Sequence, residues 1–325
     1  MLTDNHGRPV NYLRLAVTDR CNLRCFYCMP AHGLEWLERK ELMTWEEMLF
    51  VCSALVKMGI EKIRLTGGEP FARRNFINFL EELSKLEGLK EITLTTNGVL
   101  TAPYIPKLKE LGIKSVNLSL DTLDRERFAQ ITRRDELPKV LDTLHELLRH
   151  DIQVKINAVV MEGRNTEDII PLVELTKELP VSVRFIEEMP FNGNGTYEGL
   201  SWDHLRILNT IKERFPGIEK MRDPLYSTSY NYSIPEHRGT VGIIAAYTRS
   251  FCGSCNRIRI TPQGVLKTCL YDNGVMNIKD LVRAGSDTVA IQEAITSAIK
   301  KKAKDGWEAE RNRSTISESM AAIGG

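Results

Sequence analysis

The sequence predicts an α/β fold: an incomplete, TIM-like (β/α)6 barrel with a C-terminal α+β extension that closes its open side. From Tyr12 to Glu187, short β-branched runs alternate with longer amphipathic stretches, which is typical of repeated βα units and a parallel sheet. Several runs also alternate between apolar and polar residues, as barrel strands do because their side chains point inward and outward in turn. A chain of 325 residues is long enough for such a barrel and an extension.

Six strands and five helices are predicted in the barrel. The strands cover residues 12–17, 62–66, 92–96, 115–120, 153–159 and 182–186. The helices cover about 44–58, 74–86, 103–111, 138–149 and 166–178. The first helix is the clearest, because Thr44 and Glu47 form a capping box at its start and Gly59 follows its last apolar residue.

The periodicity changes after Glu187, which indicates a second region. A turn-rich linker at 191–196 leads to a helix at about 201–214. Antiparallel-looking segments then cover 227–234, 240–247 and 256–271, the last with a hairpin turn at 262–264, and short helices cover about 277–283 and 287–301. We therefore expect one unit over residues 1–190 and a second over residues 191–325.

The charge balance excludes a generally basic nucleic-acid-binding protein, because 44 Lys and Arg residues face 43 Asp and Glu residues. No apolar run approaches the roughly 18 residues of a membrane span. The first residues lack the basic flank and apolar core of a secretory signal. We therefore expect a cytoplasmic protein that binds neither nucleic acid nor membrane.

Basic residues recur inside the predicted strands, although a parallel sheet is normally apolar on both faces. Each of them alone could be a solvated strand end, but together they indicate a cationic interior that binds an anion. These residues are Arg14, Lys62, Arg64, Lys155 and Arg184.

Cysteines form a compact group directly after the first predicted strand, where Cys21, Cys25 and Cys28 have the spacing C-x3-C-x2-C. Zinc normally takes four ligands, and His32 does not have the usual spacing for the fourth. An iron–sulfur cubane held by three cysteines leaves one iron open, which favours a cluster over zinc.

This loop resembles the signature of radical S-adenosylmethionine (SAM) enzymes, in which the open iron chelates the amino and carboxylate groups of SAM. The segment Gly67-Gly-Glu-Pro70 at the end of the second strand resembles the glycine-rich motif of the same superfamily, where small residues let the backbone approach the ligand. The simpler alternative for this segment is a strand-to-helix turn.

A second group, Cys252, Cys255 and Cys269, has the spacing C-x2-C-x13-C and alone could be a fragment of a zinc ribbon. Together with the first group it resembles the GTP 3′,8-cyclases that begin molybdenum-cofactor biosynthesis. The resemblance covers essentially the whole chain and includes the segments 18–25, 63–70, 95–98, 117–121, 184–186, 252–260 and the terminal Gly324-Gly325.

This resemblance implies two [4Fe–4S] clusters, one on each cysteine group, with SAM at the first and GTP between them. SAM would contact Tyr27, Gly68, Glu69, Ser119 and Met189. GTP would contact Arg14, Lys62, Arg64, Thr95, Lys155, Arg184, Arg257, Ile258 and Arg259. Arg257, Arg259, Gly324 and Gly325 would act in catalysis, although a frayed tail is the simpler interpretation of the two glycines.

The implied reaction is that of a lyase. A 5′-deoxyadenosyl radical would abstract the ribose 3′ hydrogen of GTP, and the product would be (8S)-3′,8-cyclo-7,8-dihydroguanosine 5′-triphosphate. The implied partners are a flavodoxin- or ferredoxin-type reductant and a cyclic pyranopterin synthase that acts on the product, with a homodimer as one alternative for the oligomeric state.

Three other functions compete with this one. A peptide-modifying radical SAM maturase with an auxiliary cluster typically has a longer extension that is richer in cysteine. A non-catalytic iron–sulfur electron carrier would need neither Gly67-Gly-Glu-Pro70 nor a basic interior. A zinc-stabilised nucleic-acid module would need surface basic patches with aromatic residues.

Cys52 lies on an apolar helical stretch and is predicted to be a buried structural thiol.

Overall fold

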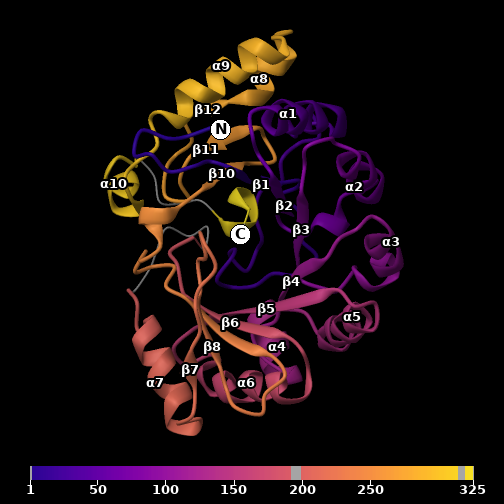
Figure 1. Ribbon diagram of the computed structural model, residues 1–325. Helices are drawn as coiled ribbons and strands as arrows, with labels where there is room; N and C mark the ends of the chain where they lie inside the picture. Colours follow the sequence, from indigo (N-terminus) through magenta and orange to yellow (C-terminus); the bar gives the residue numbers. More distant parts are fainter. Residues whose placement is uncertain (1, 192–198, 314–318, 325) are drawn as a thin grey trace.

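The computed structural model describes residues 2–191, 199–313 and 319–324. Within these residues one curved sheet has the strand order β12-β11-β10-β1-β2-β3-β4-β5-β6-β9-β8-β7, with helices along its outer face (Figure 1). Its end strands, β12 and β7, do not pair with each other among the described residues. The barrel is therefore incomplete, as predicted.

The six central strands lie where the sequence predicts them, with ends that differ by one residue at most. Each pairs in parallel with its neighbours in chain order, which confirms the repeated βα architecture. They are β1 (Tyr12–Ala16), β2 (Lys62–Thr66), β3 (Glu91–Thr96), β4 (Ser115–Ser119), β5 (Gln153–Val160) and β6 (Ser182–Glu187).

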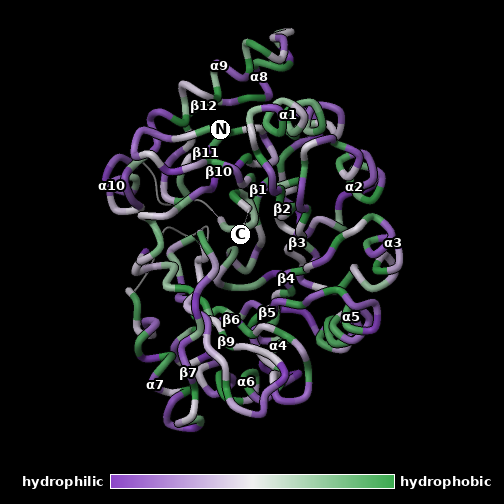
Figure 2. Tube along the Cα trace, viewed as in Figure 1, coloured by the Kyte–Doolittle hydropathy of each residue, from purple (hydrophilic) through white to green (hydrophobic). Residues whose placement is uncertain are grey.

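The outer helices follow the predicted order. They are α1 (Trp45–Lys57), α2 (Phe76–Ser84), α3 (Ile105–Glu110), α5 (Leu137–Arg149) and α6 (Ile169–Glu178), with short 3₁₀ turns η1 (Pro70–Ala72), η2 (Ala102–Tyr104) and η3 (Thr166–Asp168). Hydrophobic residues recur along α1 and α5 (Figure 2). The helix α4 (Arg125–Thr132) was not predicted, because its few apolar residues among charged ones leave only a weak helical period.

Local sequence determines where the helix α1 begins. The Thr44 hydroxyl accepts from the Glu47 backbone N–H at 3.2 Å, and the Glu47 carboxylate accepts from the Thr44 N–H at 2.7 Å. This is the predicted capping box. The same helix buries Cys52 completely among Met48, Val51 and Leu55, as predicted for a structural thiol.

The strands of the C-terminal region are not all antiparallel, which corrects the expectation for residues 240–247 and 256–271. The strand β9 (Thr240–Ile244) pairs in parallel with β6, and β10 (Arg257–Ile260) pairs in parallel with β1. Only their outer partners are antiparallel. The strand β8 (Tyr230–Ser233) pairs antiparallel with β9, and the predicted hairpin joins β10 to its antiparallel partner β11 (Val265–Lys267). The extension therefore lengthens the barrel sheet at both of its open edges.

The remaining elements complete the outer layer. They are β7 (Glu219–Lys220), β12 (Met276–Asn277), α7 (His204–Arg214), η4 (Cys252–Ser254), α8 (Ile278–Arg283), α9 (Thr288–Ile299), α10 (Gly306–Arg311) and α11 (Met320–Ile323). Most of the predicted linker at 191–196 lies outside the described residues. None of the described helices is long and apolar enough to cross a membrane.

Two apolar clusters hold these layers together. The larger one fills the space between the sheet and the helices and includes Leu13, Leu65, Val116 and Phe185. The smaller one contains Phe191, Tyr271, Ala309 and Ile323, and it joins the end of β6 to the C-terminal helices. The segment Met320–Ile323 is therefore packed against the protein and is not frayed.

Replacement of Gly264 by alanine should destabilise the protein more than replacement of Gly285. Both residues have a left-handed backbone, with φ of +85° and +81°, so both variants share a cost of about 1–2 kcal/mol. A Cβ at Gly264 would also lie 2.9 Å from the Lys279 backbone nitrogen, whereas none of the described atoms lies within 4 Å of one at Gly285. We expect Gly264→Ala to lose about 1–3 kcal/mol more free energy of unfolding in denaturant titrations, and equal losses would contradict this account of the hairpin.

Candidate functional site

The barrel encloses one large cavity of about 490 Å³. Residues from all six central strands and from the C-terminal region line it. Both cysteine groups lie on its wall, although more than 220 positions separate them in the sequence. The fold thus brings together Cys21, Cys25, Cys28, Cys252, Cys255 and Cys269 around one enclosed space.

The first cysteine loop follows β1 directly and is anchored by backbone hydrogen bonds. The Cys28 N–H donates to the Cys25 carbonyl at 3.0 Å, and the Arg24 N–H donates to the Thr132 carbonyl at 2.9 Å. The Asn97 side-chain amide lies 3.5 Å from the Cys21 sulfur.

Burial and the nearby Glu69 raise the pKa of Cys21 to about 11, and burial also raises the pKa of Cys25 and Cys28. Burial thus disfavours the free thiolates, and a bound cation would favour them.

Gly67 and Gly68 are required by the backbone that enters this loop. A Cβ on Gly67 would lie 2.3 Å from the Thr18 carbonyl oxygen, and one on Gly68 would lie 2.3 Å from the Arg20 carbonyl oxygen. The Gly68 N–H donates to that Thr18 carbonyl at 2.7 Å. The absence of side chains therefore lets the end of β2 approach the chain that leads to Cys21.

Glu69, a predicted SAM contact, lies behind the cavity wall and is fully buried. Its carboxylate accepts from the Asn97 N–H at 2.7 Å, from the Thr96 hydroxyl at 2.9 Å and from the Phe71 N–H at 3.2 Å. Burial raises the pKa of Glu69 to about 7 despite these donors. In this structure the carboxylate joins the ends of β2 and β3, and its role toward a ligand stays a prediction.

The other predicted SAM contacts, Tyr27, Gly68, Ser119 and Met189, lie on the wall. The Tyr27 hydroxyl donates to the Asp121 carboxylate at 2.7 Å, and burial raises the pKa of Asp121 to about 6. Asp121 was not among the predicted site residues, although it ends one of the quoted family segments. An acidic residue directly after a strand end was the signal that could have identified it.

The cavity wall is strongly basic, as the strand pattern suggests. Strand register places Arg14 beside both Arg64 and Arg259, and Asn157 beside Arg184. The basic residues on the wall are Arg14, Lys62, Arg64, Lys155, Arg184, Arg249, Arg257 and Arg259. Lys62 also forms an ion pair with Glu91 at 2.7 Å.

Crowding of these cations changes their pKa values and that of a neighbouring phenol. Burial and the charge of Arg184 lower the pKa of Lys155 to about 8, and burial and the charge of Arg64 lower the pKa of Arg184 to about 10. Burial alone would raise the pKa of Tyr12, but Arg64, Arg14 and Lys62 lower it to about 8. Each shift shows that the free cavity disfavours positive charge, so an anion would relieve the repulsion.

Several buried polar atoms on this wall have no hydrogen-bond partner within the part of the chain that the structure describes. They include the Nε atoms of Arg14 and Arg184, the Tyr12 hydroxyl, the Thr95 hydroxyl and the Asn157 Oδ1. Buried polar atoms of this kind are costly unless a ligand or water pairs with them, and all of those named except the Asn157 oxygen can donate. The wall is therefore suited to an anionic ligand with several acceptor oxygens.

The second cysteine group comes from two segments. Cys252 and Cys255 flank η4, and Cys269 follows β11, where the Asp272 carboxylate accepts from the Thr268 and Cys269 N–H groups at 2.8 Å. Burial would raise the pKa of Cys255, but Arg257 and Lys302 lower it to about 6. Burial raises the pKa of Cys252 and Cys269, so the effect of the cations is confined to Cys255.

The penultimate residue Gly324 lies against the ends of β1 and β2, beside Ala16 and Thr66. Its carbonyl accepts a hydrogen bond from the Arg259 guanidinium. A Cβ on Gly324 would lie 2.9 Å from both the Ala16 Cβ and the Thr66 Cγ2. Gly325 lies outside the described residues.

Two features differ from the predicted site. Ile258 is fully buried in the core and lies behind the wall, between Arg257 and Arg259. Among the residues that the structure describes, no three His, Cys, Asp or Glu side chains are grouped as ligands of one metal ion. The thiols are soft donors that suit iron–sulfur clusters, and the two groups of three face the cavity.

Two protein families match this chain. The Radical SAM superfamily matches residues 15–176, and the family Molybdenum Cofactor Synthesis C matches residues 181–307. The fold is similar to SuiB of Streptococcus suis bound to S-adenosylmethionine, with a TM-score of 0.65 and 15% identity over 96% of this chain and 76% of that one. This similarity supports the fold alone.

Relatives with higher identity define the family. The chain is 38% identical to "GTP 3′,8-cyclase" of Alkaliphilus oremlandii over the full length of both proteins. It is 41% identical to the mitochondrial "GTP 3′,8-cyclase" of Arabidopsis thaliana, over 93% of this chain and 78% of that protein. It is also 41% identical to "Molybdenum cofactor biosynthesis protein 1" of Mus musculus over 93% of this chain, but it spans only 48%, about half, of that relative's length.

The chain belongs to the radical SAM superfamily and, within it, to the family of the GTP 3′,8-cyclases. The family predicted from the two cysteine motifs is thereby confirmed. Membership of this superfamily supports SAM and an iron–sulfur cluster as cofactors.

Binding of a polyanion in the cavity should weaken as the pH rises above about 8. A bound anion favours the charged form of Lys155 and raises its pKa, so its attraction is fully present below the free pKa of about 8 and is lost above it. Ionisation of Tyr12, with a pKa of about 8, acts in the same direction. Calorimetric titration with inorganic triphosphate at pH 7 and pH 9 would measure this loss of affinity.

Lys155→Met is the matched control, because it keeps the aliphatic bulk and removes the titrating group. The ligand's own ionisation is common to both proteins, so the difference between them reports Lys155. An equal change in affinity with pH for both would contradict the assignment to Lys155.

Proposed function

We propose that this chain is a GTP 3′,8-cyclase, a lyase that converts GTP to (8S)-3′,8-cyclo-7,8-dihydroguanosine 5′-triphosphate in the first step of molybdenum-cofactor biosynthesis. The observation that carries the proposal is the meeting of two three-cysteine groups and a ring of cations on one enclosed cavity. Relatives of similar length that carry this name are about 40% identical to it, which supports the same assignment.

The first cysteine group, Cys21, Cys25 and Cys28, would hold a [4Fe–4S] cluster with one open iron. When bound, this reduced cluster and SAM supply a 5′-deoxyadenosyl radical that abstracts the ribose 3′ hydrogen. Tyr27, Gly68, Ser119 and Met189 lie on the adjoining wall and would contact SAM. The walls of the cavity would limit the access of water and stray hydrogen donors to the radical.

The second group, Cys252, Cys255 and Cys269, would hold a second [4Fe–4S] cluster. GTP would lie between the two cysteine groups. Its triphosphate would pair with the unsatisfied donors of the wall, because Arg binds phosphate oxygens bidentately and Lys adds point charge. The contributing residues would be Arg14, Lys62, Arg64, Thr95, Lys155, Arg184, Arg257 and Arg259. Division of the chain near residue 190 into a core and an extension that supplies this second group belongs to the same proposal.

The proposal also includes two protein partners. A flavodoxin- or ferredoxin-type protein would supply the electron, and a cyclic pyranopterin synthase would consume the product. We place the reaction in the cytoplasm. A homodimer is one alternative for the oligomeric state, and the structure of the single chain describes no interface for it.

Two competing functions are less well supported. The likeness to SuiB, which includes a structure bound to the precursor peptide SuiA, is at 14–15% identity and concerns the fold alone. An electron carrier would not need eight cations on one cavity wall, most of them only partly exposed and each with a desolvation cost.

The test is an anaerobic reconstitution of the full chain with iron and sulfide, followed by dithionite, SAM and GTP. We expect 5′-deoxyadenosine to form faster with GTP, and mass spectrometry to show an isomeric cyclised nucleotide. Cleavage of SAM with unchanged GTP would show that GTP is not the substrate. Absence of cleavage in a protein with verified iron content would favour the electron carrier.

Cys25→Ala should abolish SAM cleavage, whereas Arg259→Ala should spare cleavage uncoupled from GTP. Cys25 belongs to the first cluster site, but Arg259 lies on β10 beside Arg14 and contacts Gly324. We expect GTP turnover to fall by about 100-fold or more in Arg259→Ala, as for loss of one charge-stabilising donor. Equal loss of both reactions in the Arg259 variant would contradict this division.

Cys52→Ala is the control for cysteine loss, because Cys52 is buried in α1 and lies outside the cavity wall. Its iron content and SAM cleavage should match those of the unsubstituted chain. A loss of iron equal to that of Cys25→Ala would show that the assay reports general damage to the fold.

Gly324→Ala should reduce GTP turnover while the protein stays folded. The added Cβ would lie 2.9 Å from Ala16 and Thr66, so the tail must move away from Arg259. Gly112→Ala is the matched control, because Gly112 has a similar φ of +75° and none of the described atoms within 4 Å of a Cβ. Steady-state turnover at saturating SAM would check this, and equal activity of the two variants would argue for a tail without a catalytic role.

A further inference from the structure

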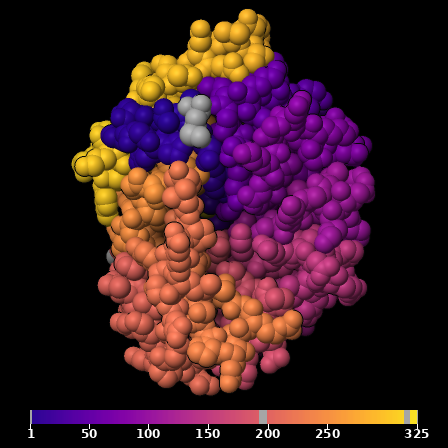
Figure 3. All heavy atoms as spheres, in the orientation of Figure 1, coloured from indigo at the N-terminus to yellow at the C-terminus, as the bar shows by residue number. Residues whose placement is uncertain are grey.

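Two buried cations lie behind the second cysteine group and outside the cavity wall. Lys302, after α9, is 2% exposed, and Arg8, in the segment before β1, is 7% exposed. Neither lines the cavity that we assign to SAM and GTP. Figure 3 shows the N-terminal residues in indigo against the C-terminal residues in yellow, so distant parts of the chain meet here.

The Lys302 ammonium joins the two segments that supply Cys255 and Cys269. It donates to the Arg257 carbonyl at 2.5 Å and to the Thr268 carbonyl at 2.9 Å, and it lies 3.6 Å from the Cys255 sulfur. Arg257 is two residues after Cys255, and Thr268 directly precedes Cys269. One side chain therefore fixes the spacing of two predicted cluster ligands.

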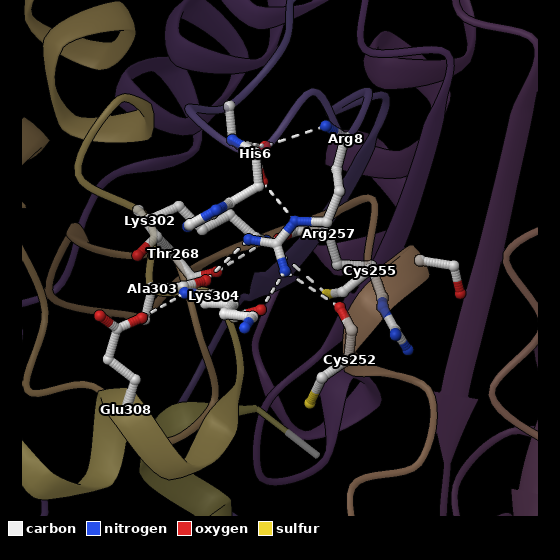
Figure 4. A network of polar contacts seen from close by, with 12 residues as sticks. His6, Arg8, Cys252, Cys255, Arg257, Thr268, Lys302, Ala303, Lys304 and Glu308 are labelled. Atoms are coloured by element: carbon white, nitrogen blue, oxygen red, sulfur yellow. Dashed lines mark hydrogen bonds and ion pairs between the residues drawn. The ribbon is translucent and has the colours of Figure 1, made fainter.

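Arg8 connects the third ligand to the same place. Its guanidinium donates to the Cys252 carbonyl at 3.0 Å, to the Lys304 carbonyl at 2.6 Å and to the Ala303 carbonyl at 2.7 Å (Figure 4). Asp4 neutralises it through an ion pair at 2.6 Å. The segment 302–304 thus contacts the chain at all three cysteines, either directly or through Arg8.

The two cations differ in their counter-charges. Arg8 has Asp4, but Lys302 has no carboxylate ion pair among the residues that the structure describes. A buried ammonium without a counter-ion is costly, and carbonyl dipoles offset only part of that cost. The Cys255 sulfur, as a thiolate in a cluster, would supply the missing negative charge.

We propose that Lys302 is a positioning residue for the second cluster, which holds Cys255 and Cys269 together and raises the cluster's reduction potential through an N–H···S hydrogen bond. Reduction adds negative charge to the cluster, and a nearby fixed ammonium stabilises the reduced form more than the oxidised form. Arg8 holds the Lys302 segment against Cys252. The identity of the bound group rests on the proposed function.

The test compares Lys302→Met and Lys302→Gln with Lys301→Met in the full chain. Lys301 is exposed and adjacent, so its variant controls for loss of one lysine in this segment. All proteins would also carry serine at Cys21, Cys25 and Cys28, so that only the second site binds a cluster. Iron per chain, its loss to a chelator, and the midpoint potential by EPR-monitored titration would be measured, with circular dichroism to verify folding.

We expect the potential to fall in both Lys302 variants and to stay unchanged in Lys301→Met. Iron should be lost faster from Lys302→Met, which removes every donor, than from Lys302→Gln, which keeps an amide. A merely structural role would change stability and iron retention without lowering the potential. An unchanged potential in Lys302→Gln would therefore overturn the proposal, even if Lys302→Met failed to fold.

The failure of the proposed function is a separate outcome. If the protein with unaltered Lys302 bound no iron at Cys252, Cys255 and Cys269, the second cluster and this inference would both be wrong. If it bound a cluster whose potential and retention did not respond to Lys302, only this inference would be wrong.

Discussion

The parallel pairing of β10 with β1 is the contact on which the candidate site depends. It joins strands about 245 positions apart, with Leu13 beside Ile258 and Arg14 beside Arg259. The buried partners Leu13 and Ile258 supply apolar packing on one face, while the arginines point to the other. Because η4 directly precedes β10 and Cys269 follows β11, this one pairing brings the second cysteine group to the cavity that the first group borders.

That pairing also places several positive charges close together on the cavity wall. Arg14 lies between Arg64 and Arg259 and is only partly exposed, and its removal from water together with Arg259 and Arg64 holds its pKa well below the usual value. Such a wall is unfavourable in the free protein and becomes favourable when several anionic oxygens enter it. The repulsion between these cations thus lowers the stability of the free fold but raises its affinity for an anion, as is common in pre-formed binding sites.

The two cysteine groups differ in surroundings as well as in position. Burial raises the pKa values of the first three thiols and also those of Cys252 and Cys269, whereas Arg257 and Lys302 lower the pKa of Cys255. The difference between the groups is therefore one thiol beside two cations in the second group, whereas Glu69 and Asp121 lie near the first.

Local patterns in the sequence were sufficient for the six strands, most helices, both cysteine motifs and the basic strand positions, because side-chain periodicity and capping residues act over a few residues. They did not reveal that β9 and β10 extend the barrel sheet, because backbone hydrogen bonds between strands do not depend on residue type and a short apolar strand pairs equally well in either direction. For the same reason the position of Glu69 behind the wall, the Tyr27–Asp121 contact and the Lys302 and Arg8 contacts came only from the structure. The sequence by itself determined which chemical groups this protein carries, and tertiary packing alone decided which of them face one another.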